Sequence, residues 1–292
     1  MNIIEVYKKY PTQKDCIEHL ELIRWRGEPS CPYCKSLNAT SMPKENRYHC
    51  NSCNTSYSVT VSTIFHKTKV DLQKWFLAIS IILNAKKGIS ARQLARDLEV
   101  DKNTAWYMQM RIRKAMFEQK DLFEGIVEAD ETYIGGKNKN RHNDKKVQNG
   151  QGRNTKDKTP IFGILERGGK IKAVKVKDVT SKTLKRIINE SVSKESTIIT
   201  DEWKSYSSLH NKYEHMVIAH CKGEYVNGIA HTNTIEGFWS LLKRGITGQY
   251  HHITKQYLDK YIDEFCYRYN NRMEIDLFEK TLSCALNFKA QA

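Results

Sequence analysis

Four cysteines arranged as two C-x2-C pairs are the strongest constraint on how this 292-residue chain can fold. Cys31 and Cys34 form the first pair, and Cys50 and Cys53 form the second pair after fifteen intervening residues. Two such turns place four thiolates around one point and complete a tetrahedral metal site. Aromatic and β-branched residues flank both pairs. We therefore expect a zinc ribbon stapled by structural zinc; two reactive dithiols are the alternative reading.

The other four cysteines are scattered along the chain, as is typical of ordinary core residues. This cysteine usage fits a reducing compartment better than an oxidising one. Residues 1–11 lack the apolar core of a secretory signal, and the longest apolar run, residues 75–83, is too short to cross a bilayer. We expect a cytoplasmic, nucleoid-associated bacterial protein without a membrane partner.

The charge balance favours a polyanionic partner. Lysine and arginine number 48 against 33 acidic residues, which gives a net charge of +15. Contacts to phosphates would dominate the affinity of such a chain for nucleic acid. The expected partner is double-stranded DNA.

A helical stretch follows the cysteine module. Apolar residues recur at helical spacing over 72–83, a short helix with a serine N-cap is expected over 90–98, and a longer helix over 102–117. A short helix, a tight turn and a basic second helix are typical of a helix-turn-helix, whose second helix enters the major groove. Arg111, Arg113 and Lys114 are the expected DNA contacts on that helix. A packing scaffold or a dimerisation element is the alternative.

From residue 125 the pattern changes to strands. Strands are expected over 126–134, 161–166, 170–176, 197–201 and 216–220, with helices over 183–192 and around residue 236. This is the element order of a ribonuclease-H-like fold. A basic loop over 137–159, which includes Lys137, interrupts it. That loop reads either as a disordered insertion or as a clamp that orders on DNA.

Three acids lie where these elements meet. Asp130 is on the first strand, Asp201 ends the fourth, and Glu236 lies on the late helix. Converging carboxylates can hold two divalent cations, which is the arrangement used for phosphodiester chemistry. Lys243 follows Glu236 by seven residues, so both share one helix face and the lysine can grip a phosphate backbone.

Longer blocks of sequence carry a family resemblance. They are residues 130–137 (Asp-Glu-Thr-Tyr-Ile-Gly-Gly-Lys), 200–203 (Thr-Asp-Glu-Trp), and the segment from His231-Thr232-Asn233 through Glu236 to Lys243-Arg244. Together with the zinc ribbon, this set resembles an insertion-sequence transposase of the ISXO type, within the DDE (retroviral-integrase-like) superfamily. The resemblance covers roughly residues 15–285.

The resemblance implies cleavage of DNA 3′ ends and strand transfer at the ends of a mobile element, with two Mg²⁺ or Mn²⁺ ions. Asp130 and Asp201 would be metal ligands, Glu236 the third ligand, and Lys243 a catalytic contact to the DNA end, with Arg244 beside it. Relatives carry either glutamate or asparagine in the third region, so Asn233 is the alternative to Glu236. A carboxylate binds a hard cation better than an amide does, which favours Glu236. Joining two DNA ends implies a homodimer or a larger oligomer.

The expected fold class is a multidomain α/β protein. Its parts are a helix and zinc ribbon over 1–66, a helix-turn-helix-like segment over 67–122, a ribonuclease-H-like catalytic domain over 123–253, and C-terminal helices over 254–292 that pack on the catalytic domain. Two other functions remain open from the sequence alone. One is a non-catalytic DNA-binding regulator derived from a transposase, and the other is a ribonuclease H or a structure-selective nuclease.

Overall fold

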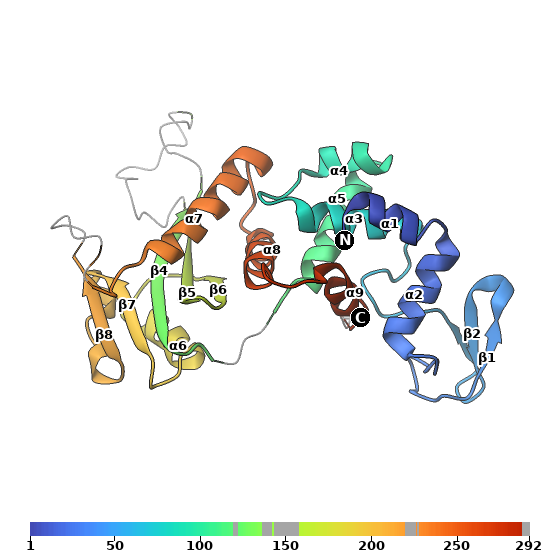
Figure 1. The fold of residues 1–292 in the computed structure, drawn as a ribbon, viewed down its shortest axis with the longest axis horizontal. Helices are drawn as coiled ribbons and strands as arrows, with labels where there is room; N and C mark the ends of the chain where they lie inside the picture. The colour runs from blue at the N-terminus through green and yellow to red at the C-terminus, as the bar shows by residue number, and fades with distance from the viewer. Residues whose placement is uncertain (119–121, 136–141, 143–157, 220–225, 227, 288–292) are drawn as a thin grey trace. The chain divides into compact units, whose positions relative to one another are not determined.

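The chain forms two compact units, shown in the computed structural model of Figure 1. The first unit consists of Met1–Phe117 together with Met273–Ala292, and the second is Glu118–Arg272. The second unit is therefore inserted into the first along the sequence. The structure describes residues 1–118, 122–135, 142, 158–219, 226 and 228–287.

The first unit opens with two capped helices and a small antiparallel sheet. Thr12 begins the second helix with a capping box, in which its hydroxyl accepts from the Asp15 backbone N–H and the Asp15 carboxylate accepts from the Thr12 N–H. The three strands pair in the order β1-β2-β3, as expected for a ribbon. The bounds are α1 Ile3–Lys9, α2 Gln13–Trp25, β1 Ala39–Met42, a 3-10 turn Pro43–Glu45, β2 Arg47–Cys50 and β3 Thr55–Tyr57.

Three helices after the ribbon match the predicted helical stretch. Ser90 is the N-cap of the short middle helix, and its hydroxyl accepts from the Gln93 backbone N–H, as the sequence predicted. The helices are α3 Leu72–Asn84, α4 Ala91–Leu98 and α5 Lys102–Ala115. Their predicted positions are confirmed to within two residues.

The last helix, α9 (Leu277–Asn287), differs from the expectation. It packs against α2, α3 and α5 of the first unit, where Phe278 contacts the rings of Phe76 and Tyr10. The Glu279 carboxylate lies 2.8 Å from His19 Nε2. The prediction that both C-terminal helices pack on the catalytic domain is therefore wrong for α9, because its apolar face is buried among the N-terminal helices.

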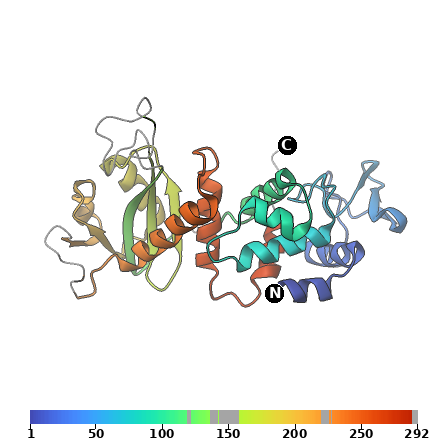
Figure 2. The same cartoon turned by 90° about the horizontal axis from the view of Figure 1, so that it is seen from above.

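The second unit is built on a five-stranded sheet in the order β6-β5-β4-β7-β8. The pairs β6-β5 and β5-β4 are antiparallel, and β4-β7 and β7-β8 are parallel. Figures 1 and 2 show α7 running beside these strands. The strands are β4 Ile126–Ile134, β5 Thr159–Glu166, β6 Ile171–Lys175, β7 Thr197–Asp201 and β8 Glu214–Ile218. The helices are α6 Ser181–Ser191, α7 Asn233–Gly245 and α8 Leu258–Asn270, with 3-10 turns Lys204–Tyr206 and Leu209–Asn211 and a π-helical turn Ile246–Tyr250.

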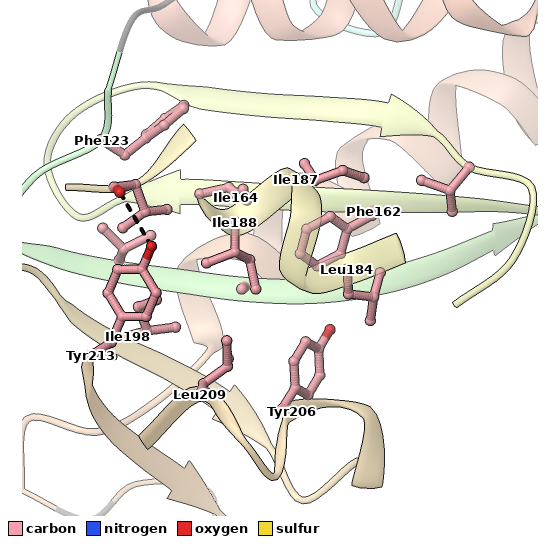
Figure 3. Close-up of a cluster of buried hydrophobic side chains, with 14 residues drawn as sticks. Phe123, Phe162, Ile164, Leu184, Ile187, Ile188, Ile198, Tyr206, Leu209 and Tyr213 are labelled. Carbon is pink, nitrogen blue, oxygen red and sulfur yellow. Dashed lines mark hydrogen bonds between the residues drawn. The ribbon is translucent and has the colours of Figure 1, made fainter. Parts of the chain in front are cut away.

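Helices cover both faces of this sheet. On one face Phe162 and Ile164 of β5 pack with α6, in the cluster that Figure 3 shows. On the other face Ile161 and Leu165 pack with α7 and α8. Successive strand residues point to opposite faces, so each face of β5 has its own apolar set. The architecture confirms the predicted ribonuclease-H-like fold of this unit.

The same alternation sorts the acids of β4. Val127 and Ala129 face α6, so Asp130 faces the side of α7 and Glu131 faces the side of α6. In the described part of the chain, no helix is long and apolar enough to cross a bilayer.

Candidate functional site

The four cysteines of the ribbon form a compact cluster. Their sulfur atoms all lie within 4.8 Å of one another. Cys31 Sγ is 3.7 Å from Cys53 Sγ, and Cys34 Sγ is 3.5 Å from Cys50 Sγ, which excludes disulfides at these separations. Four thiolates around one point are a closed structural zinc set, and they leave no coordination position for a substrate.

Three carboxylates from distant parts of the second unit line one pocket. Asp130 lies in the middle of β4, Asp201 is the last residue of β7, and Glu236 is in the first turn of α7. All three line a cavity of about 500 Å³, together with Lys243 and Arg244. The pocket thus combines the acids and the bases that the sequence singled out in this region.

The carboxylates are less tightly grouped than the thiolates. Among the described residues, only the cysteine cluster brings three or more possible ligand atoms within 4.8 Å of one another. The three acids therefore share a pocket without forming a ready-made single-ion cluster. Asp201 Oδ1 accepts from the Trp203 backbone N–H at 3.0 Å, and Glu236 Oε1 accepts from the Thr232 hydroxyl at 2.9 Å.

Asp130 carries the clearest electrostatic signal in the pocket. Burial, together with the negative charges of Glu131 and Asp201, raises its pKa to about 7; a hydrogen bond from Trp239 Nε1 to Asp130 Oδ2, 3.0 Å long, acts in the opposite direction. The pocket therefore has a surplus of negative charge. A hard divalent cation fits this donor set, because it would compensate that charge with the oxygen ligands it prefers.

Glu131 belongs to the other side of the strand. It is buried, and its Oε2 accepts from the Tyr206 hydroxyl at 2.7 Å. Burial, followed by the charge of Glu131, raises the pKa of Tyr206 well above its usual value. The hydroxyl therefore stays protonated and remains a donor to the carboxylate.

The two candidates for the third metal ligand, Glu236 and Asn233, differ in position. Glu236 lines the pocket, whereas Asn233, although exposed and described, is not among the lining residues. Lys243 and Arg244 are both exposed and line the pocket, about two turns beyond Glu236 on the same helix.

The DNA contacts predicted on α5 need correction. Arg113 is only 1% exposed, so it belongs to the core of the first unit and not to a DNA-facing surface. Arg111 is half-buried, and its guanidinium donates to the backbone carbonyls of Ile64 and His66. Lys114 is exposed as expected, and Lys137 lies outside the described residues. The periodicity was misleading because long cationic side chains can occupy a packed helix face.

Sequence reasoning missed two parts of this site. Trp239 is one of them: it is buried on α7, and its indole N–H donates to Asp130. Glu128 was not singled out, although it is fully buried and forms an ion pair with Arg167. An acid two residues before Asp130 on an otherwise apolar strand was the available signal, because both side chains then point to the same face.

Two family models match the chain. The model of the ISXO2-like transposase domain matches residues 123–270, just over half of the chain, and the model of the transposase zinc-ribbon domain matches residues 11–56. This chain belongs to the ISXO2-like transposase family. The family is one of DDE transposases, enzymes of DNA cleavage and strand transfer.

Two curated relatives of this transposase-family chain extend the comparison. A protein described as an uncharacterized protein in transposable element ISH50 of Halobacterium salinarum is 28% identical over 88% of this chain and 91% of its own length. An uncharacterized transposase-like protein of Haemophilus influenzae is 32% identical over 35% of this chain and 82% of its own length.

Solved structures give a weaker match. The Mos1 strand transfer complex has a TM-score of 0.31 at 16% identity, covering 74% of this chain and 78% of that chain. The simian T-cell lymphotropic virus intasome has a TM-score of 0.30 at 14% identity, over 59% and 63%. The fold assignment of the transposase unit rests instead on its strand order and on the family match.

Proposed function

We propose that this chain is an active transposase that cleaves DNA 3′ ends and transfers strands at the ends of a mobile element. One observation carries the proposal: Asp130, Asp201 and Glu236, from two strands and a helix, line a single pocket that Lys243 and Arg244 also line. The pocket thus combines acidic side chains, which suit divalent cations, with basic side chains, which suit the phosphates of DNA. Membership of a transposase family supports the same function.

The three carboxylates would hold the catalytic metal, with Asp130 and Asp201 as ligands and Glu236 as the third. Bound Mg²⁺ or Mn²⁺, as two ions, would supply Lewis-acid stabilisation of the attacking and leaving oxygens. Trp239 restrains the Asp130 carboxylate through its N–H, and Thr232 restrains that of Glu236. Lys243 and Arg244 would bind phosphates of the DNA end as charged donors.

The reaction needs no nucleophilic side chain. Water attacks the phosphodiester first and releases a 3′-hydroxyl at the element end, and that hydroxyl then attacks a phosphodiester of the target. In each step a P–O bond forms as another breaks, so the protein has to position the reactants and stabilise charge.

The proposed partners are double-stranded DNA at the element ends and at the target, and a second copy of the chain. The net charge of +15 suits the first partner, and the joining of two ends requires the second. The exposed Lys114 supports a DNA contact at α5, whereas Arg113 does not. The proposed compartment is the cytoplasm, next to the nucleoid. The archaeal relative shows that such a chain is not confined to bacteria.

The test is cleavage of DNA carrying the ends of the element by the full chain with Mg²⁺. Asp130→Asn and Asp201→Asn should each lower the rate of 3′-end nicking on the order of 10³-fold or more while end binding persists, because a ligand charge is lost and the fold is not. Glu190→Gln is the matched control, since Glu190 is an exposed acid of the same unit, paired with Arg186 outside the pocket.

An unchanged nicking rate in either aspartate variant would contradict the assignment. Specific binding to the ends by the wild type, without cleavage under Mg²⁺ or Mn²⁺, would instead favour the non-catalytic regulator. A preference for RNA–DNA hybrids would favour the ribonuclease alternative.

A further inference from the structure

A buried carboxylate lies just behind the pocket. Glu128 is 0% exposed and lies two residues before Asp130 on β4, so both side chains point toward α7. Buried acids persist when they are paired and hydrogen-bonded. The partners of Glu128 come from a helix and a turn that are both distant from it in the sequence.

The first set of partners is the start of α7. Glu128 Oε2 accepts from the backbone N–H groups of Thr234 at 3.0 Å and Ile235 at 2.9 Å, and Oε1 accepts from the Thr234 hydroxyl at 2.9 Å. The first turn of a helix has N–H groups without partners in the helix, and a side chain at the N-cap usually satisfies them. Thr232 at the N-cap of α7 makes no such bond, and its hydroxyl donates to Glu236 instead. Glu128 therefore caps α7 from a neighbouring strand.

The second partner is Arg167, at the turn after β5. Its Nε and Nη2 donate to Glu128 Oε1 at 3.1 and 2.9 Å. The same guanidinium donates to the backbone carbonyls of Ile229 at 2.8 Å and His231 at 3.1 Å, in the segment that leads into α7. The ion pair thus fixes both the helix start and the chain entering it.

We propose that Glu128 is a positioning residue for the metal-binding pocket, a role that rests on the function proposed above. Glu236 directly follows Ile235, whose N–H is held by Glu128. A first turn that is free to shift or fray would carry the Glu236 carboxylate away from Asp130. Glu128 joins the strand that carries one acid to the helix that carries another, and so fixes their separation.

The test compares two buried acids in the same unit. Glu128→Gln keeps the side-chain volume but removes the negative charge and replaces one of the two acceptor oxygens with an NH2 group, which donates and cannot accept from the backbone N–H groups or from Arg167. Glu264→Gln is the matched control, because Glu264 is also 0% exposed and paired with an arginine, Arg268, but lies on α8 and is not among the described residues that line the pocket. Binding of Mn²⁺ to the zinc-loaded full chain is measured by loss of the free Mn²⁺ electron paramagnetic resonance signal, with Asp130→Asn as the reference for the pocket.

We expect Glu128→Gln to weaken the Asp130-dependent Mn²⁺ binding about tenfold and to slow nicking about 10- to 100-fold, as for other residues that orient metal ligands. The dissociation constant for DNA ends should stay unchanged. Glu264→Gln should lower the melting temperature without changing Mn²⁺ affinity. Thr234→Val, which removes one donor to Glu128 and leaves the ion pair, should weaken Mn²⁺ binding about two- to fivefold.

Wild-type Mn²⁺ affinity in both Glu128→Gln and Thr234→Val would overturn the positioning role alone. Equal weakening in Glu128→Gln and Glu264→Gln would also overturn it, because a general loss of stability would then explain the effect. A wild-type chain whose Mn²⁺ binding does not depend on Asp130 would overturn the proposed function, and the positioning role with it.

Discussion

The two metal-suited sites of this chain are built in opposite ways. The four cysteines lie within a segment of 23 residues, Cys31 to Cys53, and their sulfurs converge within 4.8 Å. The three carboxylates are spread over more than a hundred residues, from Asp130 to Glu236, and share a pocket without such convergence. Local turns define the first site, whereas the whole fold of the second unit defines the other.

The sites also differ in what they contribute to stability. A three-stranded sheet as small as β1-β3 buries too little apolar surface to hold itself, so a metal bound by its thiolates adds directly to folding. The carboxylate pocket instead lowers the stability of the fold, because buried negative charges repel one another there. Burial and the neighbouring charges raise the pKa of Asp130 to about 7. If the proposed function is right, the metal that supports folding and the metals that support catalysis bind in separate units.

The largest expected effect comes from removing zinc. Stripping the metal with a chelator, or Cys50→Ser, should unfold the ribbon and abolish amide protection over β1-β3, because the sheet has lost its central staple. Hydrogen exchange followed by mass spectrometry, with zinc content measured in parallel, checks this. Protection in the second unit should persist. A zinc-free chain whose ribbon amides remain fully protected would contradict the claim that metal binding stabilises the ribbon.

A smaller effect is expected from Gly163→Ala, which tests how closely the carboxylate pocket depends on the packing of the side chains around it. Gly163 pairs with Asp130 across the sheet, and a Cβ there would lie 2.5 Å from Trp239 Cζ2. The indole would have to move and would lose its bond to Asp130. We expect a destabilisation of about 1–3 kcal/mol and slower nicking, at unchanged zinc content. Chemical denaturation and the nicking assay measure the two effects.

Gly237→Ala is the control for that variant. Gly237 lies on the same helix as Trp239, and a Cβ there meets no described atom within 4 Å. It should raise helix stability by up to about 1 kcal/mol and leave nicking unchanged. If both glycine variants behave alike, the close approach at Gly163 has no role in the site.

Apart from the Gly237→Ala control, the smallest effect is expected from Asp263→Asn on α8. Burial, with a contribution from Asp259, raises the pKa of Asp263 to about 7, well above its value of about 3.9 in an unfolded chain. The folded state then holds a proton that the unfolded state has lost, so wild-type stability falls as pH rises from about 4 to 7 and stays reduced above that.

The amide in this variant cannot ionise, so the variant should gain about 1–2 kcal/mol over the wild type at about pH 8 and little at about pH 4. Urea denaturation at both pH values measures the difference. The same stability difference at both pH values would show that the charge of Asp263 is not responsible. The destabilising effect of buried negative charge in the second unit would then be limited to the carboxylate pocket.

Sequence reasoning worked where the evidence was local. The cysteine spacing led to the ribbon, and runs of strand-forming residues led to the positions of the strands along the chain. It failed where the prediction required knowing which residues contact one another in the folded chain. Arg113 has the charge of a surface residue but is buried, and amphipathicity showed that α9 would pack without showing against which helices. Glu128 was missed because its partners, Arg167 and Thr234, become neighbours only in the folded unit.

The docking of α9 onto α2 and α3 has a consequence for synthesis of the protein. Because α9 follows the second unit in the chain, a ribosome must complete that unit before the N-terminal helices receive their last partner. A prematurely terminated product would lack α9 and carry an incomplete N-terminal unit. The apolar surface that Phe278 covers in the full chain, which includes Tyr10 and Phe76, would then be exposed to solvent and to quality-control proteases. Only a nearly full-length translation product then yields both units in their packed form.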